Sequence, residues 1–567
     1  MTDVASIRPL LAVLVSTVAI PVILSLRSRP NVREGVTLAV AATKFALVAS
    51  MVPGVLAGTT YVTRIGEFGS GVSIALRADP LGLLFGLLAS LLWIVTSFYS
   101  IGYMRGLSEH AQTRYFASFA ASLACAVGVA FGANLVTLFV FYELLTVATY
   151  PLVAHDETDE ARAAGRKYLA YTFGGGVAVL GGTALVYVLT GTTAFTPGGI
   201  EALATADPTV ARATFVLLAG GFGVKAALMP VHSWLPDAMV APTPVSGLLH
   251  AVAVVKSGVF GIARVVLDVF GTDTMAELGV ALPLAVVATI TLVTASVIAL
   301  RQDNLKRRLA YSTVSQLSYI VLGLALLRGD ALVGGLLHIP AHASMKLTLF
   351  FCAGAIHVET HTDDISDMAG IGDRMPLTMA AFAVAAAGMA GIPLIAGFVS
   401  KWYIVIGALD GGGLVFAAAL LVSGALNIAY FWPIVYQAYF ESPEGHDEKP
   451  LLFAPLGGRG GPQTDGGDGA YGDVPDGDAE NDDGGHDAHG GAHDGDTHDG
   501  GDHEAHGGPP ASGWDVRGWR GAESTWFMLG PILAAASLSV LLGVVPRAAV
   551  FLRIVETAVG SLPGVVG

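Results

Sequence analysis

The sequence has few cysteines and few charged residues. Only Cys125 and Cys352 occur among 567 residues, and both lie in apolar segments, which excludes a disulfide framework and the usual spacing of a cysteine metal site. Charged residues make up 13% of the chain and hydrophobic residues 53%, with a mean hydropathy of +0.64. A soluble domain cannot hide that much apolar surface, so we expect many membrane-spanning segments.

Other signals are also missing. The first residues, MTDVASIRPLLAVLV, lack the basic n-region and the small-residue cleavage site of a secretory signal, which predicts a retained first helix. The chain has no cysteine cluster and no phosphate-binding loop. We therefore expect no cofactor, no resident metal and no nucleic-acid partner.

Apolar segments of about 20 residues recur along the chain, which is the length that crosses a bilayer as a helix. Helices are expected because a backbone in lipid must satisfy its own hydrogen bonds. The sequence thus predicts an all-α integral membrane protein with about fourteen transmembrane helices. We place them near residues 7–26, 35–57, 79–99, 115–132, 134–154, 167–190, 211–230, 243–268, 279–300, 309–328, 331–356, 376–408, 411–440 and 524–548.

Prolines are expected to interrupt several of these helices, because proline removes an internal hydrogen bond. Pro242 and Pro244 precede the eighth helix, Pro393 splits the twelfth and Pro433 falls in the thirteenth. Broken helices at matching positions of two halves are typical of transporters with inverted repeats. We predict two five-helix repeats, helices 4–8 and helices 9–13.

Four regions follow from this pattern. Residues 1–114 are predicted to hold helices 1–3, and residues 115–440 a core of helices 4–13. Residues 523–567 are predicted to hold helix 14 and a tail. The segment 441–522 between them is rich in Gly, Asp and His, and the stretch 441–523 has 20 acidic and four basic residues. Because such a composition cannot offset the entropy of ordering, we expect a disordered linker. Six histidines from His486 to His506 also suggest metal binding, but a solvated linker is the favoured interpretation.

Positive charges concentrate in every second short loop, and such loops face the cytoplasm. This arrangement predicts a multi-pass protein of the cell membrane, with both termini outside and the acidic segment in the cytoplasm. The residues concerned are Arg27, Arg29 and Arg33; Arg105 and Arg114; Arg162, Arg166 and Lys167; and Arg301, Lys306, Arg307 and Arg308.

Five charged residues each stand inside an otherwise apolar stretch that is long enough to cross a bilayer. They are Glu143, Lys225, Lys256, Lys346 and Lys401. A charged side chain at the centre of a bilayer costs about 2.5–3.5 kcal/mol on insertion scales, so such residues usually have a function. Five of them predict a polar path that carries ions or protons.

Glu143 and Lys225 are predicted to form a proton gate. Two unit charges about 4 Å apart interact by about 4 kcal/mol at an effective dielectric constant near 20. Moving the pair together or apart would therefore switch the lysine between holding and releasing its proton. The alternative is a static ion pair that only fixes two helices.

His338, His342 and Lys346 are spaced i, i+4, i+8, so they share one helix face. Two imidazoles and an amine in a row can relay protons, since histidine titrates near neutral pH. His250 and Lys256 lie in the eighth helix and are predicted to join this relay. A single histidine at such a place would more often be a packing residue.

Lys401 follows the break at Pro393, where unwound backbone can line a water-filled cavity, and is predicted to end the path. Lys44 is the weakest candidate, because packing explains it equally well. His232 and Asp237 are expected near a membrane face, as a proton entrance or as an interfacial anchor.

At these residues the chain resembles a known family. The segments FYELLTVATYPL, GFGVKAALMPVHSWLPDAMVAPTPVSGLLHAVAVVKSG, HASMKLTLFFCAGAI and GIPLIAGFVSKWY are similar to the proton-conducting antiporter-like subunits. This family comprises the A-type and D-type subunits of Mrp multisubunit sodium/proton antiporters and the related membrane-arm subunits of respiratory complex I. The resemblance covers roughly residues 75–440.

The resemblance implies two inverted five-helix repeats around a hydrophilic axis. It implies that Glu143 and Lys225 are the fifth- and seventh-helix pair, Lys256 the eighth-helix lysine and Lys401 the terminal base. His338, His342 and Lys346 match the eleventh-helix group. The chain lacks the lateral helix of one complex I type and the extra spans of the A-type antiporter protein. The D-type subunit of an Mrp antiporter is therefore the favoured identity.

Three functions remain open on the sequence. The first is a sodium/proton antiporter component, with other subunits, lipid, Na⁺ and H⁺ as partners and no catalytic activity of its own. The second is a proton-pumping membrane component of a complex I-type oxidoreductase. The third is a structural scaffold, which predicts that Glu143→Gln lowers assembly and spares exchange.

Overall fold

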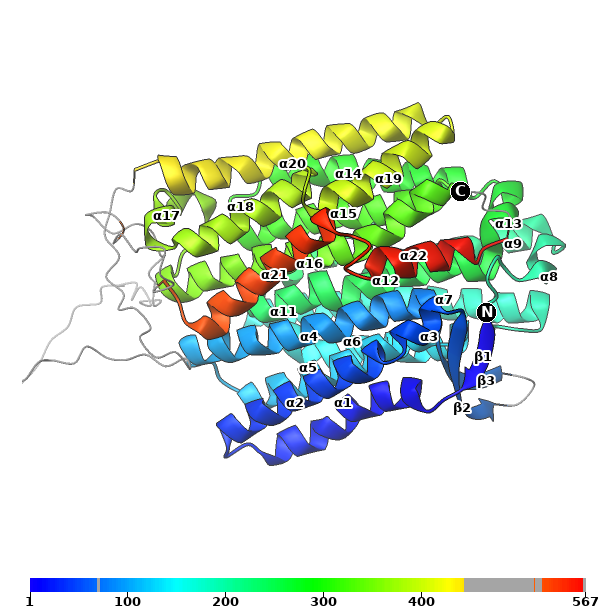
Figure 1. Ribbon diagram of the computed structural model, residues 1–567, viewed down its shortest axis with the longest axis horizontal. Coiled ribbons are helices and arrows are strands. Elements are labelled where there is room, and N and C mark those ends of the chain that lie inside the picture. Colours follow the sequence, from blue (N-terminus) through cyan, green and yellow to red (C-terminus); the bar gives the residue numbers. More distant parts are fainter. Residues whose placement is uncertain (69–71, 443–513, 515–522, 564–567) are drawn as a thin grey trace, which may run out of the picture.

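The computed structural model describes residues 1–68, 72–442, 514 and 523–563. Long helices lie side by side and form a bundle (Figure 1). The N-terminus and the last described helix, α22 (Phe551–Gly560), lie toward one end of this bundle, and the basic connections α1–α2 and α4–α5 lie at the opposite end, which also holds α17 (Ile371–Arg374). The disorder expected for the acidic segment 441–522 falls almost wholly outside the described residues.

Every segment predicted to be helical contains helix. The first half of the chain holds α1 (Arg8–Ser25), α2 (Pro30–Ala49), α3 (Val52–Leu56), α4 (Pro80–Gly106), α5 (Gln112–Phe131), α6 (Leu135–Val153), α7 (Asp159–Thr190), α8 (Glu201–Ala204), α9 (Pro208–Lys225), α10 (Trp234–Asp237), α11 (Thr243–Gly247), α12 (Val254–Arg264) and α13 (Gly271–Leu278). The second half holds α14 (Ala281–Leu300), α15 (Leu305–Ala325), α16 (Gly329–Thr360), α17, α18 (Pro376–Ala390), α19 (Ala396–Asp410), α20 (Leu414–Phe440), α21 (Trp526–Val544) and α22 (Phe551–Gly560).

Ten helical segments of the described chain are long and apolar enough to cross a membrane. They correspond to ten of the fourteen predicted spans. The other four predicted spans are α9, α15 and the two interrupted segments that contain α11–α12 and α18–α19. The chain is therefore a multi-pass membrane protein, and the count of fourteen crossings stays a prediction.

Two of the three predicted helix breaks are confirmed. Residues 391–395 separate α18 from α19 around Pro393, and Gly391 there has a φ of +93°. The other break follows α11. The π-helical turn η2 (Leu248–Val252) and α12 are separated by Ala253, which belongs to neither helix. The break expected at Pro433 is wrong, because α20 continues through this residue from Leu414 to Phe440.

The chain is mostly helical, as predicted, and one small sheet lies beside the helices. The strands β1 (Thr2–Ala5), β2 (Thr59–Phe68) and β3 (Val72–Ala78) lie in the order β1-β2-β3, at the end of the bundle that holds the N-terminus (Figure 1). β1 pairs with β2 in parallel and β2 with β3 antiparallel. In the stretch TTYVTRIGEF, apolar and polar residues alternate, which is typical of a half-solvated strand. The prediction used only the length of apolar runs, so it placed this stretch in the connection between two spans.

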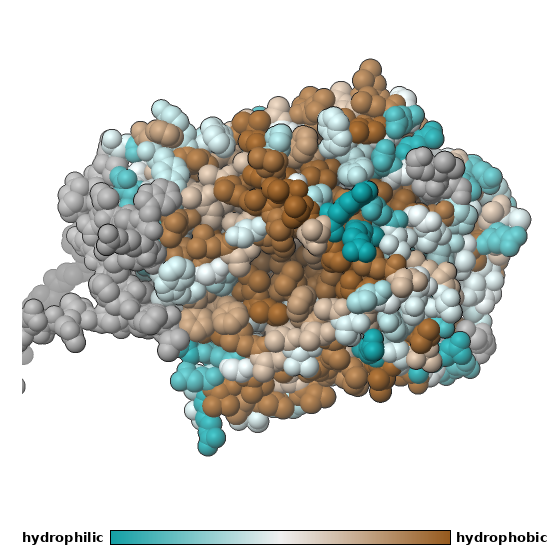
Figure 2. Space-filling view, viewed as in Figure 1, coloured by the Kyte–Doolittle hydropathy of each residue, from teal (hydrophilic) through white to brown (hydrophobic). Residues whose placement is uncertain are grey.

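The distribution of side chains is that of a membrane protein. Hydrophobic residues cover most of the middle of the face in Figure 2. On α20, for example, Val415 is 75% exposed and Leu421 65% exposed. Ionisable and polar residues lie inside the bundle instead, and Lys225, Lys256 and Lys346 are each 0% exposed.

A buried charge cluster joins the start of α4 to the end of α12. Arg264 donates from Nη1 to Asp79 Oδ2 and Asp268 Oδ2, each at 2.7 Å, and from Nη2 to Asp79 Oδ1 at 2.8 Å. Asp79 also caps α4 by accepting from the Gly82 N–H at 2.7 Å. Nothing in the sequence pairs these residues, because Arg264 and Asp79 are 185 positions apart.

We expect Asp79→Ala to destabilise the fold by about 3–5 kcal/mol, since it leaves the buried Arg264 guanidinium with one carboxylate fewer. Asp159→Ala is the matched control, because the side chain of Asp159 is fully exposed and pairs only with the partly exposed Arg162. The thermal unfolding midpoint of the purified protein is the measurement. Equal midpoints for both variants would contradict a stabilising role of the cluster.

Candidate functional site

The predicted path residues lie in the interior of the bundle. All except Glu143 are buried, and Glu143 is half-buried on α6. They come from α6, α9, η2, α12, α16 and α19, so the two halves of the chain both contribute. The buried set is Lys225, His250, Lys256, His338, His342, Lys346 and Lys401.

Lys225 ends α9 and points at α6. Its Nζ donates to the Tyr142 carbonyl oxygen at 2.5 Å and lies 3.4 Å from the centroid of the Tyr142 ring. Glu143 directly follows Tyr142 in the sequence. Within the described chain, no ion pair of 4 Å or less joins Lys225 to Glu143. The predicted gate pair is thus neighbouring but not in contact in this conformation.

Glu143 faces α7. Its Oε1 atom is buried and accepts no hydrogen bond from any described group. A Cβ atom at Gly176 on α7 would overlap this oxygen. The absence of a side chain at Gly176 therefore makes room for the carboxylate.

Lys256 and His342 form a direct contact between α12 and α16. Lys256 Nζ is 2.6 Å from His342 Nδ1, and both side chains are fully buried. One of these two nitrogens must donate and the other accept, so the pair shares a proton between two bases. Sequence spacing predicted that both belong to the path, but not that they touch.

His338 connects this pair to α15 and α19. Its ring lies 6.1 Å from the His342 ring. Its Nδ1 is 2.8 Å from Ser400 Oγ and its Nε2 is 3.0 Å from Gln316 Oε1. Ser400 directly precedes Lys401, so the polar contacts continue across the α18–α19 break.

Lys401 is held beside the break. Its Nζ donates to the Met389 carbonyl oxygen at 2.5 Å, near the end of α18, and lies 4.8 Å from the centroid of the Tyr319 ring. Tyr319 in turn stacks on His338, with ring centroids 5.5 Å apart. The break therefore supplies a carbonyl acceptor that an unbroken helix would not offer.

Lys346 lies one turn beyond His342 but contacts α15. It donates to the Leu309 carbonyl oxygen at 3.0 Å and also bonds the Ser312 hydroxyl. On α15, the side-chain amide of Gln316 donates to Asn427 Oδ1 on α20 at 3.1 Å. These uncharged residues extend the polar interior, and nothing in the sequence marks them, because Ser, Gln and Asn are common in ordinary helices.

His250 lies in the π-helical turn η2, where neither ring nitrogen has a hydrogen-bond partner among the described residues. Its ring packs against Phe350, with centroids 4.8 Å apart. Turns of this kind are frequently found at functional sites. The structure thus buries His250 near α16 without joining it to the hydrogen-bonded series.

Asp237 lines a polar cavity of about 490 Å³ that Glu160, Asn304, Lys306 and Asp363 also border. Its Oδ2 accepts from Lys167 Nζ at 2.5 Å. His232 is not among the residues that line this cavity, and its ring lies 6.3 Å from Tyr311. The two residues predicted to form an entrance therefore have different surroundings.

Lys44, the weakest candidate, is fully buried. Its Nζ donates to the Leu123 carbonyl oxygen at 2.7 Å and lies 5.3 Å from the centroid of the Trp93 ring. A lysine with one carbonyl and one aromatic ring as neighbours fits a packing role as well as a titrating one.

The space at Gly176 provides a test of Glu143. We expect Gly176→Ala to reduce proton transport about 10-fold to 100-fold, because the added methyl group displaces the Glu143 carboxylate. Gly174→Ala on the same helix is the control, since nothing lies within 4 Å of its Cβ position. Proton flux into vesicles is the measurement, and equal fluxes for the two variants would refute a positional requirement at Glu143.

Comparisons with known proteins show the family of this chain. The family model "NADH:quinone oxidoreductase/Mrp antiporter, TM" matches residues 132–427. The chain is 35% identical over 383 residues to NADH-quinone oxidoreductase subunit N of Desulforudis audaxviator, which covers 67% of this chain and 76% of the relative. It is 31% identical over 431 residues to a probable K⁺/H⁺ antiporter A/B subunit of Rhizobium meliloti, covering 74% of this chain and 42% of that protein.

A further relative is the Na⁺/H⁺ antiporter A subunit of Alkalihalophilus pseudofirmus, 35% identical over 349 residues, with 58% of this chain and 42% of the relative covered. This chain thus spans less than half the length of these two antiporter relatives. Among solved structures, a chain of the Mrp complex from Dietzia sp. DQ12-45-1b matches with a TM-score of 0.77 at 24% identity, covering 98% of this chain and 97% of the other. A chain of the archaeal membrane-bound sulfane sulfur reductase matches with a TM-score of 0.76 at 22% identity and covers 98% of both chains.

The solved structures show the shared fold, and the family model covers more than half of this sequence with the path residues from Glu143 to Lys401 inside it. The chain therefore belongs to the family of transmembrane subunits common to NADH:quinone oxidoreductases and Mrp antiporters.

Proposed function

We propose that this chain is the D-type subunit of an Mrp antiporter and moves protons in exchange for Na⁺. The observation that carries the proposal is the series of buried ionisable side chains that crosses from α12 through α16 to α19, with the Lys256–His342 contact at its centre. Ionisable residues are expensive inside a membrane, and chains of such residues are typical of proton relays.

Each group has a proposed role. Glu143 and Lys225 act as the gate, and their separation here corresponds to one of its two states. Lys256 and His342 pass a proton between two bases in direct contact. The remaining relay groups are His250, His338 and Lys346, with Lys401 as the end of the path.

The cavity at Asp237 is the proposed proton entrance. It is lined by both signs of charge, including Lys167 and Lys306 as well as Glu160 and Asp363. Such a lining holds water, which can deliver protons to the interior. His232 is proposed to act behind this cavity, toward Tyr311.

The proposed topology follows the basic loops. Both termini would lie outside the cell membrane, and the loops at the opposite end, with the acidic segment 441–522, in the cytoplasm. Helices within residues 1–114 and 523–567 would flank the conducting core, residues 115–440, whose helices 4–8 and 9–13 form the inverted repeats. Other antiporter subunits, lipid, Na⁺ and H⁺ are the proposed partners.

A second candidate is a proton-pumping membrane component of a redox complex. It is favoured by the 35% identity to the NADH-quinone oxidoreductase relative, which this chain covers over 76% of its length. The two candidates share the same path residues and differ in their partners. A purely structural scaffold is the third candidate, and it predicts that the buried charges matter for assembly alone.

The test is an exchange assay on the intact complex in sealed vesicles. With an imposed pH gradient, the antiporter proposal predicts that added Na⁺ releases the gradient without any electron donor. A redox component would instead require quinone and a reductant for proton movement. Failure of Na⁺ to release the gradient in vesicles that hold the complete complex would refute the antiporter proposal.

A further inference from the structure

Two loops at the end of the bundle opposite the N-terminus bring two imidazoles and a carboxylate together. Glu109 and His110 follow α4, and His155 follows α6. One ligand atom from each residue lies within 4.8 Å of the others. Glu109 Oε2 is the centre of the group, 3.8 Å from His110 Nδ1 and 3.9 Å from His155 Nε2.

His155 lacks the partners that a buried imidazole needs. Its side chain is 0% exposed, and neither ring nitrogen makes a hydrogen bond to any described group. Buried polar atoms are nearly always satisfied, so an orphaned pair points to a missing partner such as an ion.

His110 is oriented as metal-binding histidines usually are. Its Nε2 is 3.0 Å from the His155 carbonyl oxygen, which can only accept, so Nε2 carries the proton. Nδ1 then presents its lone pair toward Glu109. A ligand ring that donates its other N–H to a backbone carbonyl is the common support of such sites. The His110 side chain is 51% exposed, which gives an ion access from solvent.

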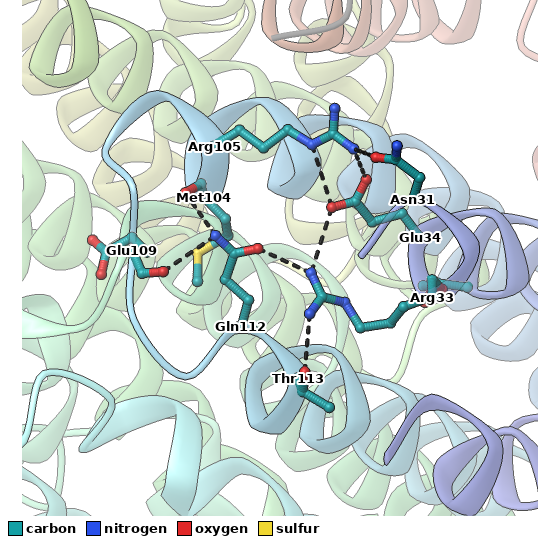
Figure 3. A network of polar contacts seen from close by, with 9 residues as sticks. Asn31, Arg33, Glu34, Met104, Arg105, Glu109, Gln112 and Thr113 are labelled. Carbon is teal, nitrogen blue, oxygen red and sulfur yellow. Dashed lines mark hydrogen bonds and ion pairs between the residues drawn. The ribbon is translucent and has the colours of Figure 1, made fainter. Parts of the chain in front are cut away.

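Hydrogen bonds from the Gln112 side chain fix the main chain of the loop that carries Glu109. Gln112 Nε2 donates to the carbonyl oxygens of Glu109 and Met104, each at 3.2 Å, and Gln112 Oε1 accepts from Arg33 at 2.9 Å. Figure 3 shows this network, with the Glu109 carboxylate pointing away from it. The main chain is thus fixed while the carboxylate stays available.

The local charge also favours a cation. Among the described residues, the ion-pair contacts of the Glu109 carboxylate are to the two imidazoles, so a cation bound between them would neutralise its negative charge. The one guanidinium that contacts the group in the described chain, Arg114, donates to the His155 carbonyl oxygen at 3.0 Å and pairs with Glu157. Its charge is therefore already matched by a carboxylate.

We propose that Glu109, His110 and His155 bind a divalent transition-metal ion of the Zn²⁺ type, with water in the remaining position. Two imidazoles and a carboxylate are a common Zn²⁺ ligand set. Bonds of about 2.0–2.1 Å bring tetrahedral ligands to about 3.4 Å from each other. Rotation of the partly exposed Glu109 and His110 side chains would bring the ligand atoms from their present separations to this distance. A bound ion would tie the α4–α5 loop to the end of α6, the helix of Glu143.

The test is a titration of the intact complex with Zn²⁺, and with Co²⁺ as a spectroscopic probe. The histidines from His486 to His506 would add their own binding, so the parent and all variants carry glutamine at these six positions. We expect one equivalent of Zn²⁺ per chain, and an absorption band of Co²⁺ with histidine ligands. His110→Asn should weaken binding at least 10-fold. It changes an exposed side chain, so the fold should be kept.

His155→Phe should remove the site while filling the same volume, and His361→Asn, a histidine outside the group, is the control that should bind as the parent does. The proposal is overturned if the parent binds no Zn²⁺, or if His110→Asn binds it with unchanged stoichiometry and affinity. Because exchange is not the readout, this result stands apart from the test of the antiporter proposal.

Discussion

Lys225→Ala is expected to lower sodium-dependent proton exchange about 100-fold or more, the usual range for loss of a positioned proton-transfer group. The ammonium occupies the space between the Tyr142 carbonyl oxygen and ring. Alanine leaves no group there that can hold a proton. The measurement is the rate at which added Na⁺ releases a pH gradient in vesicles, divided by the amount of assembled complex.

Lys225→Arg separates a proton carrier from a fixed charge. Arginine keeps the positive charge and can still donate to Tyr142, but it does not release a proton in proteins. We therefore expect Lys225→Arg to assemble normally and to lose exchange nearly as far as Lys225→Ala. Exchange at the parent rate in the arginine variant would contradict the gate and favour a fixed positive charge that holds α9 against α6.

Lys256→Met is expected to have an effect of similar size, again about 100-fold. Methionine fills most of the lysine volume but removes the partner of His342 Nδ1, at the point where α12 and α16 are joined. The series of proton-holding groups is then interrupted at its centre. The same vesicle assay measures the loss.

Ser257→Ala is the matched control for this change, because the Ser257 hydroxyl bonds the Val254 carbonyl oxygen of its own helix, at 2.7 Å, and lies outside the series. It should exchange at the parent rate. If Lys256→Met retained most of the exchange while assembled complex stayed at the parent level, the contact with His342 would not lie on the path.

Sequence alone predicts the spans well, because long apolar runs have few alternatives in lipid. The break at Gly391 was also foreseeable from Pro393, whereas the position of the break at Ala253 was not, because Pro242 and Pro244 lie at the start of α11. Pro433 shows the limit of the argument from proline. Proline removes one hydrogen bond, and α20 stays continuous through this residue.

The sequence predicts which ionisable residues lie in the interior, but it does not predict their contacts. Charge in an apolar run identifies Lys256 and Lys346, since nothing else explains the insertion cost. The contact between Lys256 and His342 joins residues 86 positions apart, and helix rotation decides it. Periodicity places His342 and Lys346 on one helix face. However, Lys346 bonds the Ser312 hydroxyl on α15 and not His342.

The central claim is that buried groups change protonation during exchange, and infrared difference spectroscopy tests it directly. Spectra of the complex before and after a sodium gradient is applied should differ by a carboxylic acid C=O band, and Glu143→Gln should remove this band together with exchange. An identical difference spectrum in Glu143→Gln, with exchange preserved, would mean that the carboxylate holds its helices in place and carries no proton.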